Sequence, residues 1–170
     1  LLAGWEYPAR GSVHLLGKEL GILNQDGKAA LRAGNVGFLF QTFHLLAGLS
    51  AIENVEIALE LAGYDNTRPV AADLLDRVGL SERVNHYPSQ LPGGEQQRVA
   101  LARACAVNPK VLLADEPTGY LDAETSGLIA DLLGALRQAF RRSILRVTHD
   151  ASLADRSARI LTPGLAGAGR

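Results

Sequence analysis

Short apolar runs alternate with longer helical patterns in this chain, and this alternation restricts the fold more than any other feature of the sequence. Residues 35–40, 111–114 and 144–148 form compact apolar runs, which suit strands buried inside a sheet. Helical patterns cover residues 26–32 and 123–139. Strands separated by helices predict an α/β fold, in which crossover helices connect the strands of a parallel sheet.

The middle of the chain contains helical patterns and no strand pattern. The first pattern has apolar residues at steps of three and four positions, namely Ile52, Val55, Leu59 and Ala62. Such spacing places them on one face of a helix. Ser50 is a suitable N-cap for this helix, and Glu53 three positions later predicts a capping box. Two further helical patterns cover residues 68–78 and 95–107.

These patterns predict how the chain is organised. We expect a helical subdomain over residues 50–107 that is inserted into an α/β core made by residues 1–49 and 108–170. Near the start of the chain, residues 1–4 resemble the last turn of a helix, and residues 10–20 suit a short strand and a turn.

Composition and charge exclude several classes of protein. The 170 residues carry a formal net charge of -1, which argues against a nucleic-acid-binding surface. Cys105 is the only cysteine, so no internal disulfide can form, and a reducing compartment is the simpler interpretation. The sequence contains no apolar run of the roughly 20 residues that a membrane-spanning helix needs. Any role at a membrane therefore requires a partner.

Two carboxylates, Asp115 and Glu116, directly follow the apolar run at residues 111–114. Ligands of open α/β sheets bind at the carboxyl ends of the strands. One carboxylate there can hold Mg²⁺ through water, and the next can polarise an attacking water molecule. Acidic residues also occur at strand ends for solubility, so this pair alone leaves both interpretations about equally open.

Three further signals are weak when taken separately. Gly93 and Gly94 precede a helical pattern, and a helix N-terminus with an accessible backbone suits a phosphate. An ordinary glycine-rich loop is the simpler alternative. His149 and Gln41 each follow an apolar run, but a histidine at a strand end is more often an ordinary surface residue than a catalyst.

The order of these signals along the chain is more specific than any one of them. Gln41 comes first, then Leu-Pro-Gly-Gly-Glu-Gln-Gln-Arg at residues 91–98, then Asp-Glu-Pro-Thr-Gly-Tyr-Leu-Asp at residues 115–122, and then Thr-His-Asp at residues 148–150. This order closely resembles the ATP-binding domain of ABC transporters, over about residues 1–155. The resemblance implies a P-loop NTPase-like fold that binds and hydrolyses ATP.

The resemblance also implies roles for the residues at the strand ends, with ATP and Mg²⁺ as cofactors. Asp115 matches the Walker B aspartate that holds Mg²⁺, and Glu116 matches the general base. Gln41 matches the Q-loop glutamine, which contacts Mg²⁺ and the attacking water. His149 matches the switch histidine near the γ-phosphate.

A second set of residues matches family positions that act between two subunits. Gly93, Gly94, Glu95 and Gln96 match the signature motif, which closes over the γ-phosphate of ATP bound to the opposite subunit. Asp122 matches the D-loop aspartate at the dimer interface. The resemblance thus implies a head-to-tail dimer whose closure and ATP hydrolysis drive a transmembrane permease subunit from the cytoplasmic face of the inner membrane.

Residues 38–46, 53–55 and 60–63 look like the subfamily that serves bacterial lipoprotein release and macrolide-type export. In that group the segment after the Q-loop glutamine helps to receive a coupling helix of the permease. Core packing is the simpler interpretation of the apolar side chains of this segment, which are Phe43, Leu45 and Leu46.

The sequence also departs from the family in three respects. The P-loop pattern G-x-x-x-x-G-K-[ST] does not occur in residues 1–170, and the chain has no Met. We therefore expect an N-terminally truncated fragment that does not bind ATP tightly by itself. Pro92 replaces the signature serine, and Arg146 interrupts an apolar strand, where it needs an acidic partner or an edge position.

These departures leave an alternative function open, which is a truncated, catalytically inactive ABC-domain remnant that acts at most as a binding module. An ABC ATPase of DNA repair is a poorer match, because the stretch between Gln41 and Leu91 contains neither heptads nor pairs of cysteines.

Overall fold

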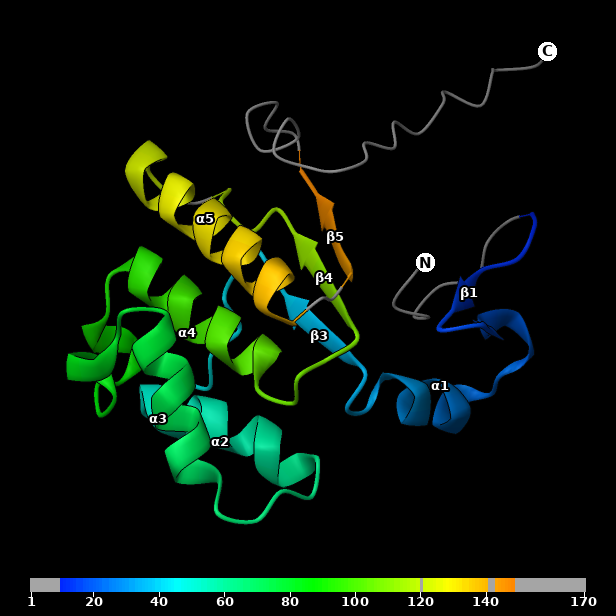
Figure 1. Ribbon diagram of the computed structural model, residues 1–170, viewed down its shortest axis with the longest axis horizontal. Helices are drawn as coiled ribbons and strands as arrows, with labels where there is room; N and C mark the ends of the chain where they lie inside the picture. The colour runs from blue at the N-terminus through cyan, green and yellow to red at the C-terminus, as the bar shows by residue number, and fades with distance from the viewer. Residues whose placement is uncertain (1–9, 120, 141–142, 149–170) are drawn as a thin grey trace.

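The computed structural model describes residues 10–119, 121–140 and 143–148 (Figure 1). Its strands are β1 (His14–Leu15), β2 (Lys18–Glu19), β3 (Val36–Leu39), β4 (Val111–Asp115) and β5 (Ser143–Val147). Its α-helices are α1 (Gln25–Arg32), α2 (Ala51–Leu61), α3 (Thr67–Arg77), α4 (Gly93–Cys105) and α5 (Ala123–Phe140). Short 3₁₀ turns lie at Leu20–Ile22, Ser81–Arg83 and Pro88–Gln90.

Strands β3, β4 and β5 form a parallel sheet in that order, which confirms the predicted α/β fold. Helices α2, α3 and α4 connect β3 to β4, and α5 connects β4 to β5. In Figure 1 these helices lie to one side of the sheet, while α1 and the antiparallel β1–β2 hairpin lie to the other. The sheet therefore has chain on both sides, as the apolar character of its strands predicts.

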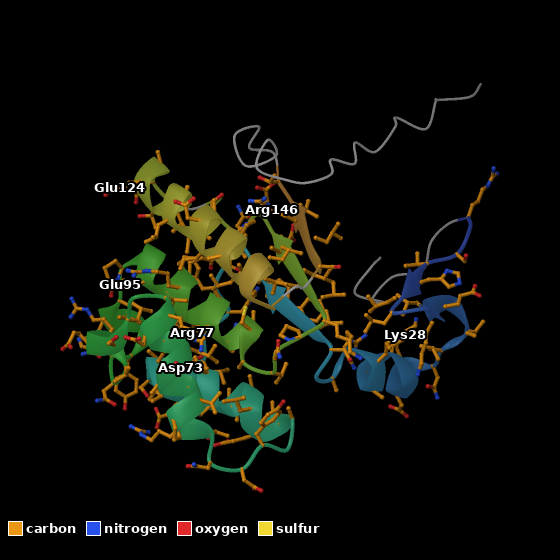
Figure 2. All side chains as sticks on the ribbon, viewed as in Figure 1. Lys28, Asp73, Arg77, Glu95, Glu124 and Arg146 are labelled. Atoms are coloured by element: carbon orange, nitrogen blue, oxygen red, sulfur yellow. The ribbon has the colours of Figure 1, made fainter. Side chains whose placement is uncertain are left out.

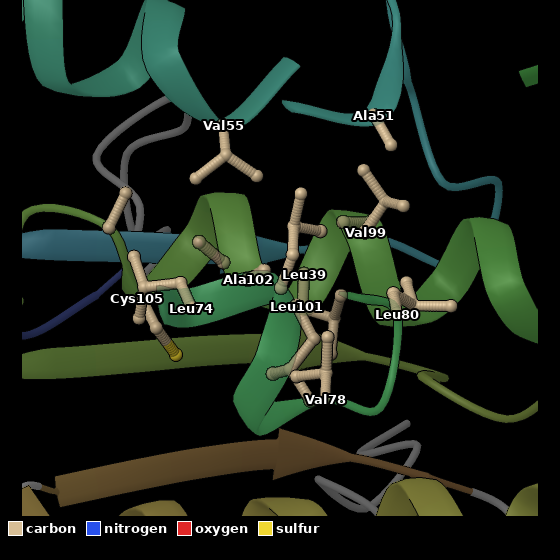
Figure 3. Packing of buried hydrophobic residues seen from close by; sticks show 14 of the residues in the cluster. Leu39, Ala51, Val55, Leu74, Val78, Leu80, Val99, Leu101, Ala102 and Cys105 are labelled. Atoms are coloured by element: carbon tan, nitrogen blue, oxygen red, sulfur yellow. The ribbon is translucent and has the colours of Figure 1, made fainter. Parts of the chain in front are cut away.

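The two faces of the sheet belong to two separate apolar clusters. Side chains alternate between the faces along each strand. One face contributes Leu39, Leu112 and Ala114 to a large cluster that includes the buried residues of α2, α3 and α4 (Figure 3). The other face contributes Val36, Phe38, Val111 and Leu113 to a small cluster with Leu15, Leu20 and Leu31. Most of the buried apolar surface thus lies on the helical side.

Helix α4 lies directly against β3, and a glycine permits this contact. A Cβ atom built at Gly37 would lie 2.2 Å from the carbonyl oxygen of Ala104. No side chain fits at that distance, so Gly37 lets the backbones of the helix and the strand approach closely.

The start of α4 differs from its prediction. The sequence pattern placed the helix at residues 95–107, whereas the structure begins it at Gly93 and ends it at Cys105. Pro92 has an extended backbone and is the N-cap, and its carbonyl oxygen accepts the N–H groups of Glu95 and Gln96 at 2.9 and 3.0 Å. The two glycines are therefore the first helical residues, although their intrinsic propensity disfavours a helix.

The predicted capping box at the start of α2 is confirmed. The Glu53 carboxylate accepts the backbone N–H and the hydroxyl of Ser50 at 2.7 and 2.6 Å. These bonds, the hydroxyl first, lower the pKa of Glu53. One position later, the buried Asn54 amide donates to the carbonyl oxygens of Leu46 and Leu49, so the first turn of α2 also fixes the loop that follows β3.

Arg146 lies on β5, opposite Ala114, and its side chain is half-buried (Figure 2). Within the described ranges β5 is an outer strand of the sheet, which is one of the two situations that the sequence allowed for this arginine. The helical turn expected at residues 1–4 lies outside the described residues. In the described part of the chain, no helix combines the length and the apolar character that crossing a membrane requires.

Candidate functional site

The parallel register of the sheet brings the chemistry-bearing residues of three strands to one edge, called here the strand-end edge (Gln41, Asp115, Glu116 and Thr148). Ala114 of β4 pairs with Leu39 of β3, and Asp115 pairs with Val147 of β5. Each member of the strand-end edge is the last residue of its strand or follows it by one or two positions. Three of the predicted site residues, Gln41, Asp115 and Glu116, thus lie at this edge.

Glu116 has an unusual backbone conformation at this edge. Its φ of 42° lies in the left-handed region, where a residue other than glycine needs support from its surroundings. Its N–H donates to the carbonyl oxygen of Val147 at 2.9 Å, and its carboxylate accepts the hydroxyl of Thr148 at 3.4 Å. Glu116 is half-buried, whereas Asp115 is exposed.

Thr148 is a site residue that sequence reasoning missed. In the sequence it stands out only as the first residue of Thr-His-Asp, but in the structure its hydroxyl donates to the carboxylate of Glu116. Its position directly after an apolar strand was the available signal. The predicted switch residue His149 follows it immediately but lies outside the described residues, so its role stays a prediction.

The side chain of Gln41 lies against the turn that follows Glu116. A Cβ atom built at Gly119 would lie 2.5 Å from the Nε2 atom of Gln41, so a larger residue at this position would displace the end of the Gln41 side chain. The N–H of Gly119 donates to the carbonyl oxygen of Glu116 at 3.0 Å. Gln41 and Glu116 are therefore held close to each other through one short turn.

The strand-end edge fits a hydrated magnesium ion better than a metal enclosed by protein. Mg²⁺ prefers oxygen ligands, and it commonly keeps several water molecules while binding one or two carboxylates and the phosphates of a substrate. Asp115 is exposed at the end of β4, and the amide of Gln41 lies against Gly119 in the turn that follows Glu116. Among the described residues, no group of three His, Cys, Asp or Glu side chains could hold a metal without such help.

The first turn of α4 forms the second part of the candidate site. The N–H groups of Gly93 and Gly94 precede the first hydrogen bond of the helix, which begins with the N–H of Glu95. Such N–H groups and the helix dipole favour an anion. A Cβ atom built at Gly94 would lie 2.3 Å from the Cγ2 atom of Thr125, and one built at Gly93 would lie 3.6 Å from the ring of Phe43.

The side chains of Glu95 and Gln96 are engaged within the helical part of the chain. The Glu95 carboxylate forms ion pairs with Arg83 at 3.5 Å and with Arg98 at 3.9 Å (Figure 2 labels Glu95). The Gln96 amide donates to the carbonyl oxygen of Leu91 at 2.9 Å. Because both backbone N–H groups donate to Pro92, the predicted phosphate contacts of these two residues stay a prediction.

Asp122 caps helix α5. Its carboxylate accepts the N–H of Thr125 at 2.9 Å and the hydroxyl of Thr125 at 2.8 Å. These two bonds, the backbone bond first, lower the pKa of Asp122. Because the methyl group of Thr125 touches Gly94, Thr125 also connects this cap to the start of α4. The predicted role of Asp122 at a dimer interface is compatible with its exposure and stays a prediction.

Two further residues of α4 contact the segments next to the strand-end edge, and sequence reasoning missed both. Gln97 is 0% exposed, and its amide donates to the carbonyl oxygens of Phe40 and Pro117 at 3.3 and 2.6 Å. Arg103 donates to the carbonyl oxygens of Phe43 and His44 at 2.9 and 2.6 Å, and burial lowers the pKa of this guanidinium.

Comparisons with known proteins agree with this geometry. The sequence profile of the family described as "ABC transporter" matches residues 1–119. An uncharacterized ABC transporter ATP-binding protein, YbbA of Escherichia coli K12, is 47% identical over 163 residues, which cover 95% of this chain and 72% of that protein. The lipoprotein-releasing system ATP-binding protein LolD of Xanthomonas campestris pv. campestris is 44% identical and covers 95% of this chain and 68% of its own length.

A solved structure gives the same answer for the fold. It is the dimeric, post-hydrolysis state of the ATP-binding cassette MJ0796 bound to ADP and Pi. Its TM-score is 0.81 at 36% sequence identity, and the match covers 91% of this chain and 69% of that chain. The matches in sequence and in structure agree with the order of motifs along the chain. The chain therefore belongs to the family of ABC transporter ATP-binding proteins, the nucleotide-binding ATPases that energise transport.

Proposed function

We propose that the protein is the Mg²⁺-dependent ATPase subunit of a bacterial transport complex of the lipoprotein-release or export type. The proposal rests on one observation: the parallel register of the strands gathers Gln41, Asp115 and Glu116 at one edge of the sheet. The similarity to LolD supports the lipoprotein-release type.

In this proposal each residue of the strand-end edge has one task. Asp115 is exposed and holds Mg²⁺, which neutralises charge on the phosphate oxygens when it is bound. Glu116 accepts a hydrogen bond from the attacking water, orients it and takes up its proton as general base. Gln41 lies against the turn after Glu116 and contacts the same water and the metal. Positioning and charge neutralisation of this kind supply most of the catalysis in phosphoryl transfer.

The first turn of α4 serves a second copy of the protein. We infer that Gly93 and Gly94 bind the γ-phosphate of ATP held by the opposite subunit in a head-to-tail dimer. The exposed Asp122, next to this turn through Thr125, lies at the same interface. The dimeric state of the MJ0796 cassette supports this arrangement.

A transmembrane permease is the proposed second partner. An open groove of about 420 Å³ lies between the end of α1, strand β3 and the ends of α2 and α4. Its apolar wall includes Phe38, Phe40 and Leu61, and Leu61 is 83% exposed. We infer that this groove receives an amphipathic cytoplasmic segment of the permease. The protein then lies at the cytoplasmic face of the inner membrane.

Two experiments test the function. The first uses the protein made from its complete gene and measures phosphate release from ATP with and without Mg²⁺. Hydrolysis that requires Mg²⁺ supports the proposal. Complete inactivity favours the alternative function, an inactive remnant, to which Pro92 at the N-cap of α4 also points.

The second experiment co-purifies the permease with the Leu61→Asp variant. We expect the complex to dissociate. Ile22→Asp is the matched control, because Ile22 is 78% exposed and does not line the groove. Retention of the permease by the Leu61 variant would count against the groove.

A further inference from the structure

Helix α4 binds the loop that carries Gln41 at both ends of that loop. The loop is defined here as the Gln41 loop, residues 40–44. Its first carbonyl oxygen, that of Phe40, accepts from Gln97, and its last two, those of Phe43 and His44, accept from Arg103. Gln41 and Thr42 lie between these anchor points.

The orientation of the Gln97 amide follows from its neighbours. Both groups in reach are carbonyl oxygens, so the NH₂ group has to face them and donate one hydrogen to each. The second acceptor is the carbonyl oxygen of Pro117, at 2.6 Å, one residue after Glu116. The side chain is completely buried, and replacing it by an apolar one would remove the hydrogen bonds that it donates to these two carbonyl oxygens. Gln97 thus joins the segments that carry Gln41 and Glu116.

Arg103 holds the other end of the loop in a strained conformation. Phe43 and His44 both have left-handed backbones, with φ values of 42° and 47°. Residues other than glycine keep this conformation only where their surroundings enforce it. Two donors of one guanidinium bind two successive carbonyl oxygens, and hydrogen bonds from a charged donor are stronger than neutral ones.

The position of Gln97 within α4 connects the two parts of the candidate site. It lies one helical turn after Gly93, the residue at the start of the helix. A helix is stiff over such a distance, so a displacement of its first turn also displaces Gln97 and Arg103. The Gln41 loop and the segment after Glu116 have to follow, because otherwise the hydrogen bonds of Gln97 and Arg103 would break.

We propose that Gln97 and Arg103 are positioning residues that make α4 and the Gln41 loop move as one body. When the first turn of α4 engages a phosphate, this connection holds Gln41 in register with Glu116, because Gln97 also bonds to Pro117. The inference rests on the proposed function, because it assigns a task to residues that contact neither ATP nor the water.

The test uses the full-length protein in complex with its permease. Gln97→Met removes both donors and keeps the length of the side chain, and Arg103→Met does the same for the loop's other end. Gln90→Met and Arg77→Met are matched controls. Gln90 accepts from the N–H of Tyr87 on the surface, and Arg77 pairs with Asp73 on the exposed side of α3 (Figure 2 labels both partners).

We expect at least a tenfold fall in kcat for each α4 variant, with KM for ATP changed less than threefold, at a temperature where all variants are folded. The permease should also lose most of its stimulation of the ATPase in Gln97→Met, because Gln97, unlike Arg103, does not line the proposed permease groove. Arg103→Lys keeps the positive charge and one donor nitrogen, so it should recover part of kcat. If Arg103→Met does not fold, Arg103→Lys is compared with the parent protein instead. A side chain with only a structural role would lower Tm and leave kcat per folded molecule unchanged.

Hydrogen exchange separates failure of this inference from failure of the proposed function. We expect amides of the Gln41 loop to exchange at least tenfold faster in Gln97→Met and Arg103→Met than in the controls. Unchanged exchange, or unchanged kcat and permease stimulation in folded variants, would overturn the inference. If the unmodified protein hydrolyses no ATP, the proposed function fails, and the exchange rates still decide whether α4 holds the loop.

Discussion

The strand-end edge and the first turn of α4 both offer groups suited to phosphate chemistry, but they are built in opposite ways. The backbone register of three parallel strands positions the edge, and its most polar member, Asp115, is exposed. Side chains position the helix turn, through Gln97 and the ion pairs of Glu95. A register of backbone hydrogen bonds is stiff, whereas side-chain contacts can be exchanged.

This difference suggests a division of labour. The backbone register keeps Asp115 and Glu116 in a fixed geometry, whereas the first turn of α4 and the Gln41 loop are held by side-chain bonds that can be exchanged. Changes at the edge should therefore alter turnover with little effect on stability. Changes at the helix turn should alter the stability of the protein or the closure of the proposed dimer. At this turn the sequence already departs from the family, since Pro92 replaces the signature serine.

The largest expected effect is at the edge. Glu116→Gln keeps the size of the side chain and removes the base, so turnover should fall at least about 100-fold, while ATP still binds and Tm changes little. Steady-state phosphate release and nucleotide binding measure the two effects. Glu124→Gln, in the exposed first turn of α5, is the control. Equal losses in both variants would contradict the role of Glu116.

Gly94→Ala should produce the next largest effect, on stability. The new methyl group would collide with the Cγ2 atom of Thr125, and such overpacking costs about 1–3 kcal/mol. Urea denaturation measures the loss. Thr125→Ser removes that methyl group and keeps the hydroxyl that binds Asp122, so the double variant should recover most of the stability. Additive losses in the double variant would show that the two side chains do not compete for one space.

A smaller effect is expected at the N-cap of α4. Pro92→Ser supplies a hydroxyl and an N–H, and one regained hydrogen bond to phosphate is worth about 0.5–1.5 kcal/mol. Turnover should therefore rise by about two- to tenfold. Pro92→Ala supplies the N–H alone and separates the two contributions. A rate for Pro92→Ser at or below that of the parent protein would remove the reason to regard this proline as a defect.

The smallest expected effect depends on pH and concerns the cap between the two regions. The folded protein lowers the pKa of Asp122, chiefly through the N–H of Thr125. The carboxylate therefore contributes stability above the ordinary aspartate pKa of about 3.9, and this contribution is lost as the pH falls through the lowered value.

The check is a comparison of denaturation midpoints. The parent protein should be more stable than Asp122→Ala near pH 7, and the difference should shrink below about pH 4. Asp65→Ala, in the exposed segment before α3, is the control. A difference that is independent of pH would mean that the charge of Asp122 does not matter for the cap.

Features that depend on local pattern could be predicted from the sequence. The bounds of β3, β4 and β5 agree with the apolar runs to within one or two residues, because a buried strand requires continuous apolar side chains. The capping box of α2 was predicted for the same kind of reason, since its two partners are three positions apart. The gathering of Gln41, Asp115 and Glu116 followed from the order of motifs and from the rule that ligands bind at strand ends.

Features that depend on distant backbone groups could not be predicted. Gln97 bonds to Phe40, 57 positions away, and Arg103 bonds to His44, 59 positions away. Every residue offers a carbonyl oxygen, so the sequence does not reveal which one a distant side chain will reach. The predicted helical pattern starts two residues after the first residue of α4. The sequence places Gly93 and Gly94 directly before the helix, but it does not show that the Pro92 carbonyl and the packing of Gly94 on Thr125 include them in it.

The pairing of β3 with β4 also has a consequence for the order in which the protein folds. Val36 pairs with Val111 only after three helices have been passed along the chain, and contacts of such long range form late because closing the intervening segment costs entropy. Helices α2, α3 and α4 contribute most of the buried residues of the large apolar cluster, so they can assemble first and bring the two strands together. On this view the polypeptide completes its strand-end edge last, and a chain released too early would expose two unpaired apolar strands to aggregation.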